Sequence, residues 1–116
     1  MLHFETQEFN SPDLPNSGIN MDNAFLQMLD DARGIAGIPF KITSGYRSVE
    51  HNQKVGGVSN SSHLIGKACD IAVGSGNKRY IIINALIKAG FSRLGVAKTF
   101  IHCDNDETKP NSIWTY

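Results

Sequence analysis

Apolar residues recur at intervals of three and four positions from residue 21 to residue 35, which is the spacing of one buried helix face. These positions are Met21, Phe25, Met28, Leu29, Ala32 and Ile35. Asn20 is a candidate N-cap and Gly37 a candidate C-cap. The pattern predicts a core helix between these two residues.

Two further helices are predicted downstream. Ser48 can cap a short helix that reaches about Lys54, and a flexible loop over 56–60 follows it. Residues 74–77 interrupt the chain and can cap a longer helix, which ends at Gly90. The apolar face of this helix consists of Ile81, Ile82, Ala85, Leu86 and Ala89.

Over 40–44, 68–73 and 99–104, side chains of different character fall on two faces with a period of two, which predicts strands. Residues 91–96 are predicted as a strand or a turn, and 113–116 as a closing strand. We therefore expect an α+β fold, in which a small antiparallel sheet carries two main helices on one side and an open cleft on the other.

The chain has 116 residues, of which 41% are hydrophobic and 19% charged, as is usual for one folded domain. We expect a single domain over 1–116, with a turn-rich arm over 1–19 that Phe4 and Phe9 hold in place. Cys69 and Cys103 are expected to be buried and reduced.

Positive and negative side chains are balanced, with 11 Lys and Arg against 11 Asp and Glu. The chain therefore lacks the basic excess that would indicate a nucleic-acid or anionic-membrane partner. The first residues lack the features of a secretory signal, and no apolar stretch approaches the roughly twenty residues of a membrane span. We expect a monomer that binds neither nucleic acid nor membrane.

Three potential metal ligands are His63, Asp70 and His102. A catalytic zinc keeps three protein ligands of these types and leaves one position for water. Serine and asparagine over 59–62 favour a loop for His63, whereas Asp70 and His102 fall within predicted strands. The sequence therefore indicates a zinc site.

The alternative is that these residues bind no metal. His63 would then lie in a surface loop, Asp70 on an edge strand, and His102 would be partly buried and hydrogen-bonded to backbone. Two features oppose it. An aspartate or histidine within an apolar strand costs free energy unless another group pairs with it. Gly66 suits a tight turn that brings His63 back over the strand.

The order of several motifs resembles the zinc D-Ala-D-Ala carboxypeptidase family, which includes peptidoglycan peptidases and phage endolysins and shares its fold with the hedgehog signalling domain. The matching stretches are Ser-Gly-Tyr-Arg at 44–47, Asn52, Gly56-Gly57, Ser-x-His-x-x-Gly-x-Ala-x-Asp at 61–70 and Ile-His-x-Asp at 101–104. The resemblance extends from Phe9 to Trp114.

The resemblance implies a role for each matching residue. His63, Asp70 and His102 would bind Zn²⁺. Arg47 would lie near the substrate carbonyl or carboxylate, and Tyr46 and Ser61 would contact substrate.

One position departs from the family pattern. Several members supply the general base from an acidic residue three positions before the last histidine, where this chain has Thr99. A threonine hydroxyl accepts no proton at neutral pH. Asp104 is the replacement candidate, and the competing interpretation makes it a partner that orients a ligand histidine.

The leading hypothesis is a zinc metallopeptidase that cleaves stem or cross-link peptides of peptidoglycan, as a carboxypeptidase or an endopeptidase. The alternatives are a zinc domain that binds cell-wall peptides without turnover and a structural domain without metal. Lacking an export signal, the chain would reach the cell wall or periplasm through a phage or another export route, and would otherwise be cytoplasmic.

Overall fold

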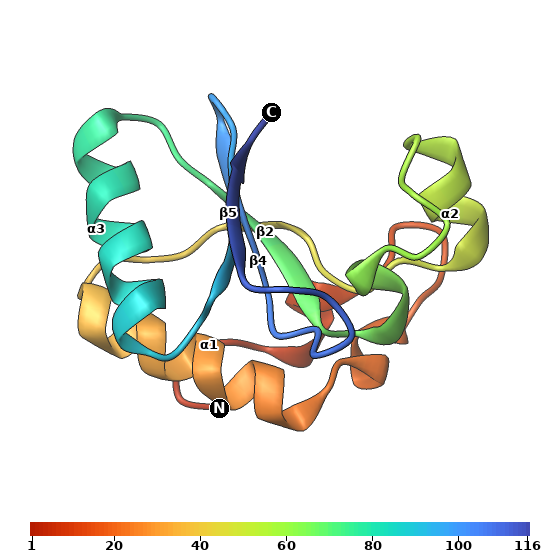
Figure 1. Cartoon of the computed structure of the whole chain (residues 1–116). Helices are drawn as coiled ribbons and strands as arrows, with labels where there is room; N and C mark the ends of the chain where they lie inside the picture. Colours follow the sequence, from red (N-terminus) through yellow and green to blue (C-terminus); the bar gives the residue numbers. More distant parts are fainter.

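The computed structural model describes residues 1–116 (Figure 1). Its α-helices are α1 (Asn23–Ala36), α2 (Val49–Lys54) and α3 (Gly76–Lys88). Three short 3-10 helices are η1 (Thr6–Phe9), η2 (Ser17–Asn20) and η3 (Ser62–Ile65). The strands are β1 (Ile42–Ser44), β2 (Ala68–Ala72), β3 (Arg93–Val96), β4 (Phe100–Asp104) and β5 (Ser112–Thr115).

The five strands form one sheet in the order β1-β2-β4-β3-β5. All neighbours are antiparallel except β3 and β5, which are parallel. The α+β class is therefore confirmed, but the last strand departs from the expected antiparallel pairing. The connection over 105–111 carries the chain past β3 to its far side, so that β5 runs antiparallel to β4 and parallel to the strand between them.

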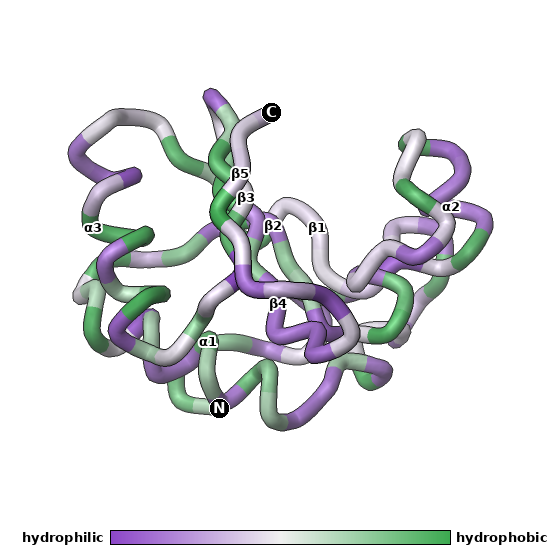
Figure 2. Tube along the Cα trace, in the orientation of Figure 1, coloured by the Kyte–Doolittle hydropathy of each residue, from purple (hydrophilic) through white to green (hydrophobic).

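Helices α1 and α3 lie on one side of the sheet, and α2 lies on the other side (Figure 1). The core fills the space between these two helices and the sheet, with Phe25 and Leu29 from α1, Leu86 from α3, and Ile71 and Ile101 from the strands all fully buried. In Figure 2 hydrophobic and hydrophilic residues alternate along α1 and α3, whereas the connection from β4 to β5 is mostly hydrophilic.

Alternation along the strands separates the two faces of the sheet. Cys69 and Cys103 face each other across β2 and β4 with their sulfur atoms 3.7 Å apart, and both are buried and free. The residues beside them, Asp70 and His102, point to the opposite face. The apolar face of the sheet therefore packs against α1 and α3, and the opposite face carries the polar residues Asp70 and His102.

Several element boundaries differ from the predicted ones. The N-cap of α1 is Asp22, whose side chain accepts a hydrogen bond from the Phe25 N–H, and Asn20 belongs to η2 instead. The first strand starts at Ile42, two residues later than expected. His63 lies in η3 and not in an irregular loop, because the Ser61 side chain caps that turn.

The arm over 1–19 packs against the domain through Phe4 and Phe9, which are 7% and 0% exposed. The Asp30 carboxylate accepts hydrogen bonds from the Leu2 and His3 N–H groups. No helix in the structure combines the length and apolar character that crossing a membrane requires.

Candidate metal centre

His63 is held over the polar face of the sheet by η3. Ser61 accepts a hydrogen bond from the His63 N–H, and the His63 carbonyl accepts one from the Arg47 N–H. The turn ends at Gly66, which adopts a left-handed conformation with φ of 71°. A side chain at Gly66 would place its Cβ 2.3 Å from the Asn20 carbonyl oxygen, so the turn requires glycine.

Asp70 and His102 are direct partners in the register of β2 and β4. Directly opposed residues of an antiparallel pair project their side chains to the same face, about 5 Å apart. The strand pairing alone therefore brings this carboxylate and this imidazole together.

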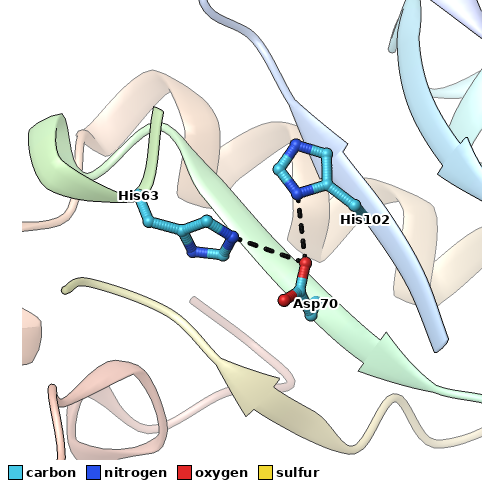
Figure 3. Close-up of side chains that lie close together, drawn as sticks. All are labelled: His63, Asp70 and His102. Atoms are coloured by element: carbon cyan, nitrogen blue, oxygen red, sulfur yellow. Dashed lines mark hydrogen bonds and ion pairs between the residues drawn. The ribbon is translucent and has the colours of Figure 1, made fainter. Parts of the chain in front are cut away.

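The three side chains converge on one point (Figure 3). The Oδ1 atom of Asp70 lies 3.4 Å from Nε2 of His63 and 3.1 Å from Nδ1 of His102. One ligand atom of each residue lies within 4.8 Å of the other two, and all three residues are buried. The group could thus hold a metal ion.

The remaining nitrogen of each imidazole has a fixed partner. Nδ1 of His63 donates to the Gly45 carbonyl oxygen at 2.7 Å, because a carbonyl can only accept. Nε2 of His102 donates to Oδ2 of Asp104, also at 2.7 Å. When each neutral imidazole carries its proton on this fixed nitrogen, the other nitrogen faces Asp70 and is free to bind a metal.

The two carboxylates beside His102 stabilise positive charge at its ring. Burial raises the pKa of Asp70, but the hydrogen bonds from His102 and His63 outweigh it and hold that pKa well below its usual range. Burial lowers the pKa of His102, yet the hydrogen bonds to Asp104 and Asp70 raise it to about 9. Two carboxylates flanking one imidazole thus stabilise positive charge at this point.

The residues fit zinc in type and in spacing. Imidazole nitrogen and carboxylate oxygen are common zinc ligands, and a tetrahedral ion with bonds of about 2.0–2.1 Å separates its ligand atoms by about 3.4 Å. Two of the measured separations, 3.4 Å and 3.1 Å, lie close to that value.

The group lies in a cleft of about 390 Å³. Its lining includes Arg47 and Ser61, as the resemblance implies. Arg47 places Nη2 3.5 Å from Oδ2 of Asp70 and also contacts Ser44 and Asn52. Tyr46 does not line this cleft, because successive side chains of an extended chain point to opposite sides, and it packs against the hydrophobic core.

Thr99 and Asp104 differ in their relation to the group. Thr99 is exposed and is absent from the cleft lining. The Asp104 carboxylate is 1% exposed and is bonded to His102 and Arg93. This geometry favours the orienting interpretation of Asp104, because its oxygens already have partners on the side of His102 away from Asp70.

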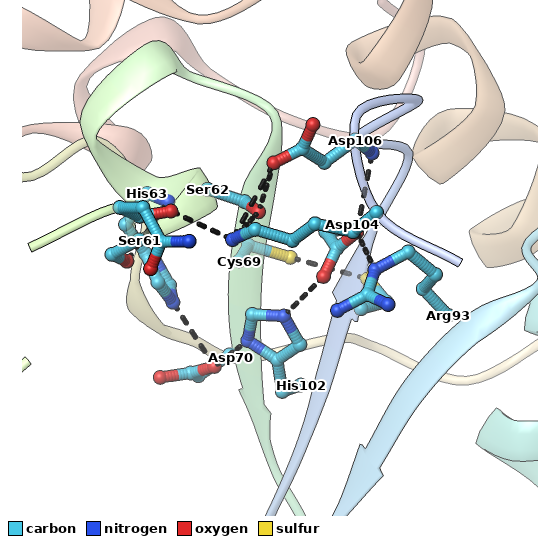
Figure 4. Close-up of polar contacts among 12 residues, drawn as sticks. Ser61, Ser62, His63, Cys69, Asp70, Arg93, His102, Asp104 and Asp106 are labelled. Carbon is cyan, nitrogen blue, oxygen red and sulfur yellow. Dashed lines mark hydrogen bonds and ion pairs between the residues drawn. The ribbon is translucent and has the colours of Figure 1, made fainter. Parts of the chain in front are cut away.

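Other polar residues around the site carry no sequence motif. Lys109 donates to the Asn60 carbonyl oxygen and to Ser62 Oγ. Ser62 in turn donates to Asp106 (Figure 4). These bonds connect the turn that holds His63 to the connection after β4. Sequence reasoning missed them because each joins residues more than 40 positions apart in irregular segments.

The α+β fold thus presents two imidazoles and one carboxylate in an open cleft, in an arrangement that could hold one metal ion. The chain belongs to the peptidase M15 family, whose sequence model matches residues 3–104. A stretch of 37 residues is 49% identical to the zinc D-Ala-D-Ala carboxypeptidase of Streptomyces albus G. That stretch covers 32% of this chain and 14% of the relative's length.

Proposed function

We propose that the chain is a zinc-dependent metallopeptidase that hydrolyses stem or cross-link peptides of peptidoglycan. The observation that carries the proposal is the convergence of His63, Asp70 and His102, each imidazole being fixed through its other nitrogen. Membership of a peptidase family and the name of the matching relative support the reaction and the metal.

Zinc at such a site supplies Lewis acidity, which activates water and polarises a peptide carbonyl. The residues of the chain bind and orient the reactants. Arg47 lies beside Asp70 in the cleft, where its guanidinium can stabilise negative charge that develops on the carbonyl oxygen. Gly45 and Asp104 hold the two imidazoles in their ligating orientation.

One observation favours the alternative, a zinc domain that binds peptides without turnover. Apart from Asp70 and Asp104, no carboxylate lines the cleft, and the only imidazoles there are the two proposed ligands. General acid–base catalysis contributes roughly a hundredfold to ten-thousandfold to such reactions. A hydrolase of this sequence would therefore rely on another proton acceptor or react slowly.

Metal content and turnover together test these functions. We expect about one zinc per chain by elemental analysis for the wild type and for the control His51→Ala, and none for His63→Ala, because a site with two ligands left holds zinc weakly. Peptides ending in D-Ala-D-Ala and cross-linked muropeptides are then incubated with the protein, and the products are identified by mass spectrometry.

Release of D-alanine identifies a carboxypeptidase, and separation of cross-linked chains identifies an endopeptidase. Either activity should disappear with a chelator and return with zinc. Binding of muropeptides without products supports the alternative, and a wild-type chain that retains no zinc contradicts both.

A further inference from the structure

Arg93, on β3, contacts Asp104, the hydrogen-bond partner of His102, and also contacts Pro110 and Trp114. Its Nε donates to Oδ1 of Asp104 at 2.7 Å, and its Nη1 donates to the Pro110 carbonyl oxygen. Its guanidinium carbon lies 4.9 Å from the ring centroid of Trp114. Only 13% of this side chain is exposed, so the guanidinium is held in one position by groups from β4, β5 and the connection between them.

Trp114 contacts His102 as well as Arg93, so that Arg93, Asp104, His102 and Trp114 form a closed cycle of side-chain contacts. Its ring centroid lies 5.4 Å from that of His102. In the register of the sheet, His102 on β4 faces Gly95 on β3, and Gly95 faces Trp114 on β5. A Cβ at Gly95 would lie 2.7 Å from the indole nitrogen, so the absent side chain is what allows the indole to cross β3.

Hydrogen bonds from Arg93 and Asp106 fix the orientation of the Asp104 carboxylate (Figure 4). Oδ1 accepts hydrogen bonds from Arg93 Nε and from the Asp106 N–H, which leaves Oδ2 directed at Nε2 of His102. A carboxylate fixed in this way holds the imidazole with Nδ1 turned toward Asp70. Partners of this kind tune a ligand histidine as well as orient it.

We propose that Arg93, braced by Trp114, is a positioning residue that sets the metal affinity of the centre by fixing Asp104 and, through it, His102. The inference rests on the metal centre assigned under the proposed function. It concerns β3 and β5, and Trp114 lies beyond the residues that the family model matches. Arg93 acts through Asp104, so its effect on metal binding depends on that carboxylate.

The test is the zinc dissociation constant, measured by competition with a chromophoric chelator. Arg93→Met keeps the length of the side chain but removes the donors and the charge, and should weaken zinc binding about 10-fold to 100-fold. Arg93→Lys keeps the charge without the planar fork and should fall between Arg93→Met and the wild type. The matched control Arg79→Met, on α3, should bind zinc as the wild type does.

A double-mutant cycle separates positioning through Asp104 from a general loss of structure. If Arg93 acts through Asp104, Arg93→Met should weaken zinc binding no further once Asp104→Asn is present. Additive losses, or an Arg93→Met affinity equal to that of the wild type, would overturn the inference while leaving the proposed function standing. Loss of zinc from the wild type itself would overturn both.

The chain contains one tryptophan, which provides a second readout at the site. Co²⁺ bound by His102 should quench the fluorescence of Trp114, because the two rings are in contact. The quenching titration should shift to higher Co²⁺ concentration in Arg93→Lys and remain in place in Arg79→Met. An unshifted Arg93→Lys titration would contradict the inference even if Arg93→Met failed to fold.

Discussion

His102 is bonded at both ring nitrogens by aspartates, and the two aspartates differ in what else they contact. Both line the cleft, but Asp70 shares its oxygens between the two imidazoles and Arg47, and 11% of its side chain is exposed. Asp104 is almost fully buried and is bonded to Arg93. The first arrangement suits a metal ligand, and the second suits a group that fixes the imidazole.

Substitution of Asp104 by asparagine separates the two roles considered for this residue. An amide can donate where the carboxylate accepted, which favours the tautomer of His102 that carries its proton on the metal-facing Nδ1. We expect Asp104→Asn to weaken zinc binding about 10-fold to 100-fold. The measurement is zinc affinity by equilibrium dialysis, beside turnover at saturating zinc.

A general base would give the opposite result. Zinc affinity would then be unchanged in Asp104→Asn, and turnover at saturating zinc would fall by roughly a hundredfold or more. Asp31→Asn, at an exposed position on α1, serves as the control for an unspecific effect of the substitution.

At the scale of elements, the position of His63 depends on how η3 ends. Gly66 and Gly37 both end a helix in the left-handed conformation, with φ of 71° and 68°. They differ in surroundings, because a Cβ at Gly37 meets nothing within 4 Å and one at Gly66 meets the Asn20 carbonyl oxygen. The pair therefore separates backbone strain from steric overlap.

We expect Gly37→Ala to lower the free energy of unfolding by about 1 kcal/mol, the cost of a left-handed alanine. Gly66→Ala should lower it by about 2–4 kcal/mol, since a steric overlap adds roughly 1–3 kcal/mol. Denaturant unfolding of both variants gives the comparison. Equal losses would show that the Asn20 backbone moves aside freely.

The elements that sequence predicted well are those in which one face is buried. Periodicity located α1, α3, β2 and β4, and with them two of the three proposed ligands, Asp70 and His102, because burial of one face imposes the period of the element. Register then brings Asp70 opposite His102, which alternation alone does not specify. The resemblance implies that Tyr46 contacts substrate, and this stays a prediction, since Tyr46 packs against the core and is absent from the cleft lining.

The parallel pairing of β5 and the contacts of Arg93 with Asp104 and Trp114 could not be predicted from the sequence. Both depend on the path of residues 105–111, a polar segment without periodicity that could return the chain to either edge of the sheet. Gly95 carried a signal in retrospect, since glycine inside a strand often marks a close approach of another group.

At the scale of the whole molecule, the N-terminal arm is joined to the domain by buried carboxylate hydrogen bonds as well as by Phe4 and Phe9. Asp30, only 5% exposed, accepts from two backbone N–H groups of the arm. Burial raises the pKa of Asp30, but these two hydrogen bonds outweigh it and leave the pKa below its ordinary value. The ionised carboxylate is therefore the form that stabilises the fold.

Removal of that charge should have an effect that depends on pH. Hydrogen bonds to a charged group contribute about 1.5–3 kcal/mol, so Asp30→Asn should lower the free energy of unfolding by about that amount at pH 7. Because the folded pKa lies below the unfolded value of about 3.9, the contribution is present above that value and is lost as pH falls through the folded pKa. The difference in the free energy of unfolding between wild type and Asp30→Asn, measured by urea unfolding, should thus shrink from pH 7 to pH 3. The control Asp31→Asn should change the free energy of unfolding little at either pH, because the Asp31 carboxylate is exposed. A difference that stayed constant with pH would mean that shape, and not charge, holds the arm to α1.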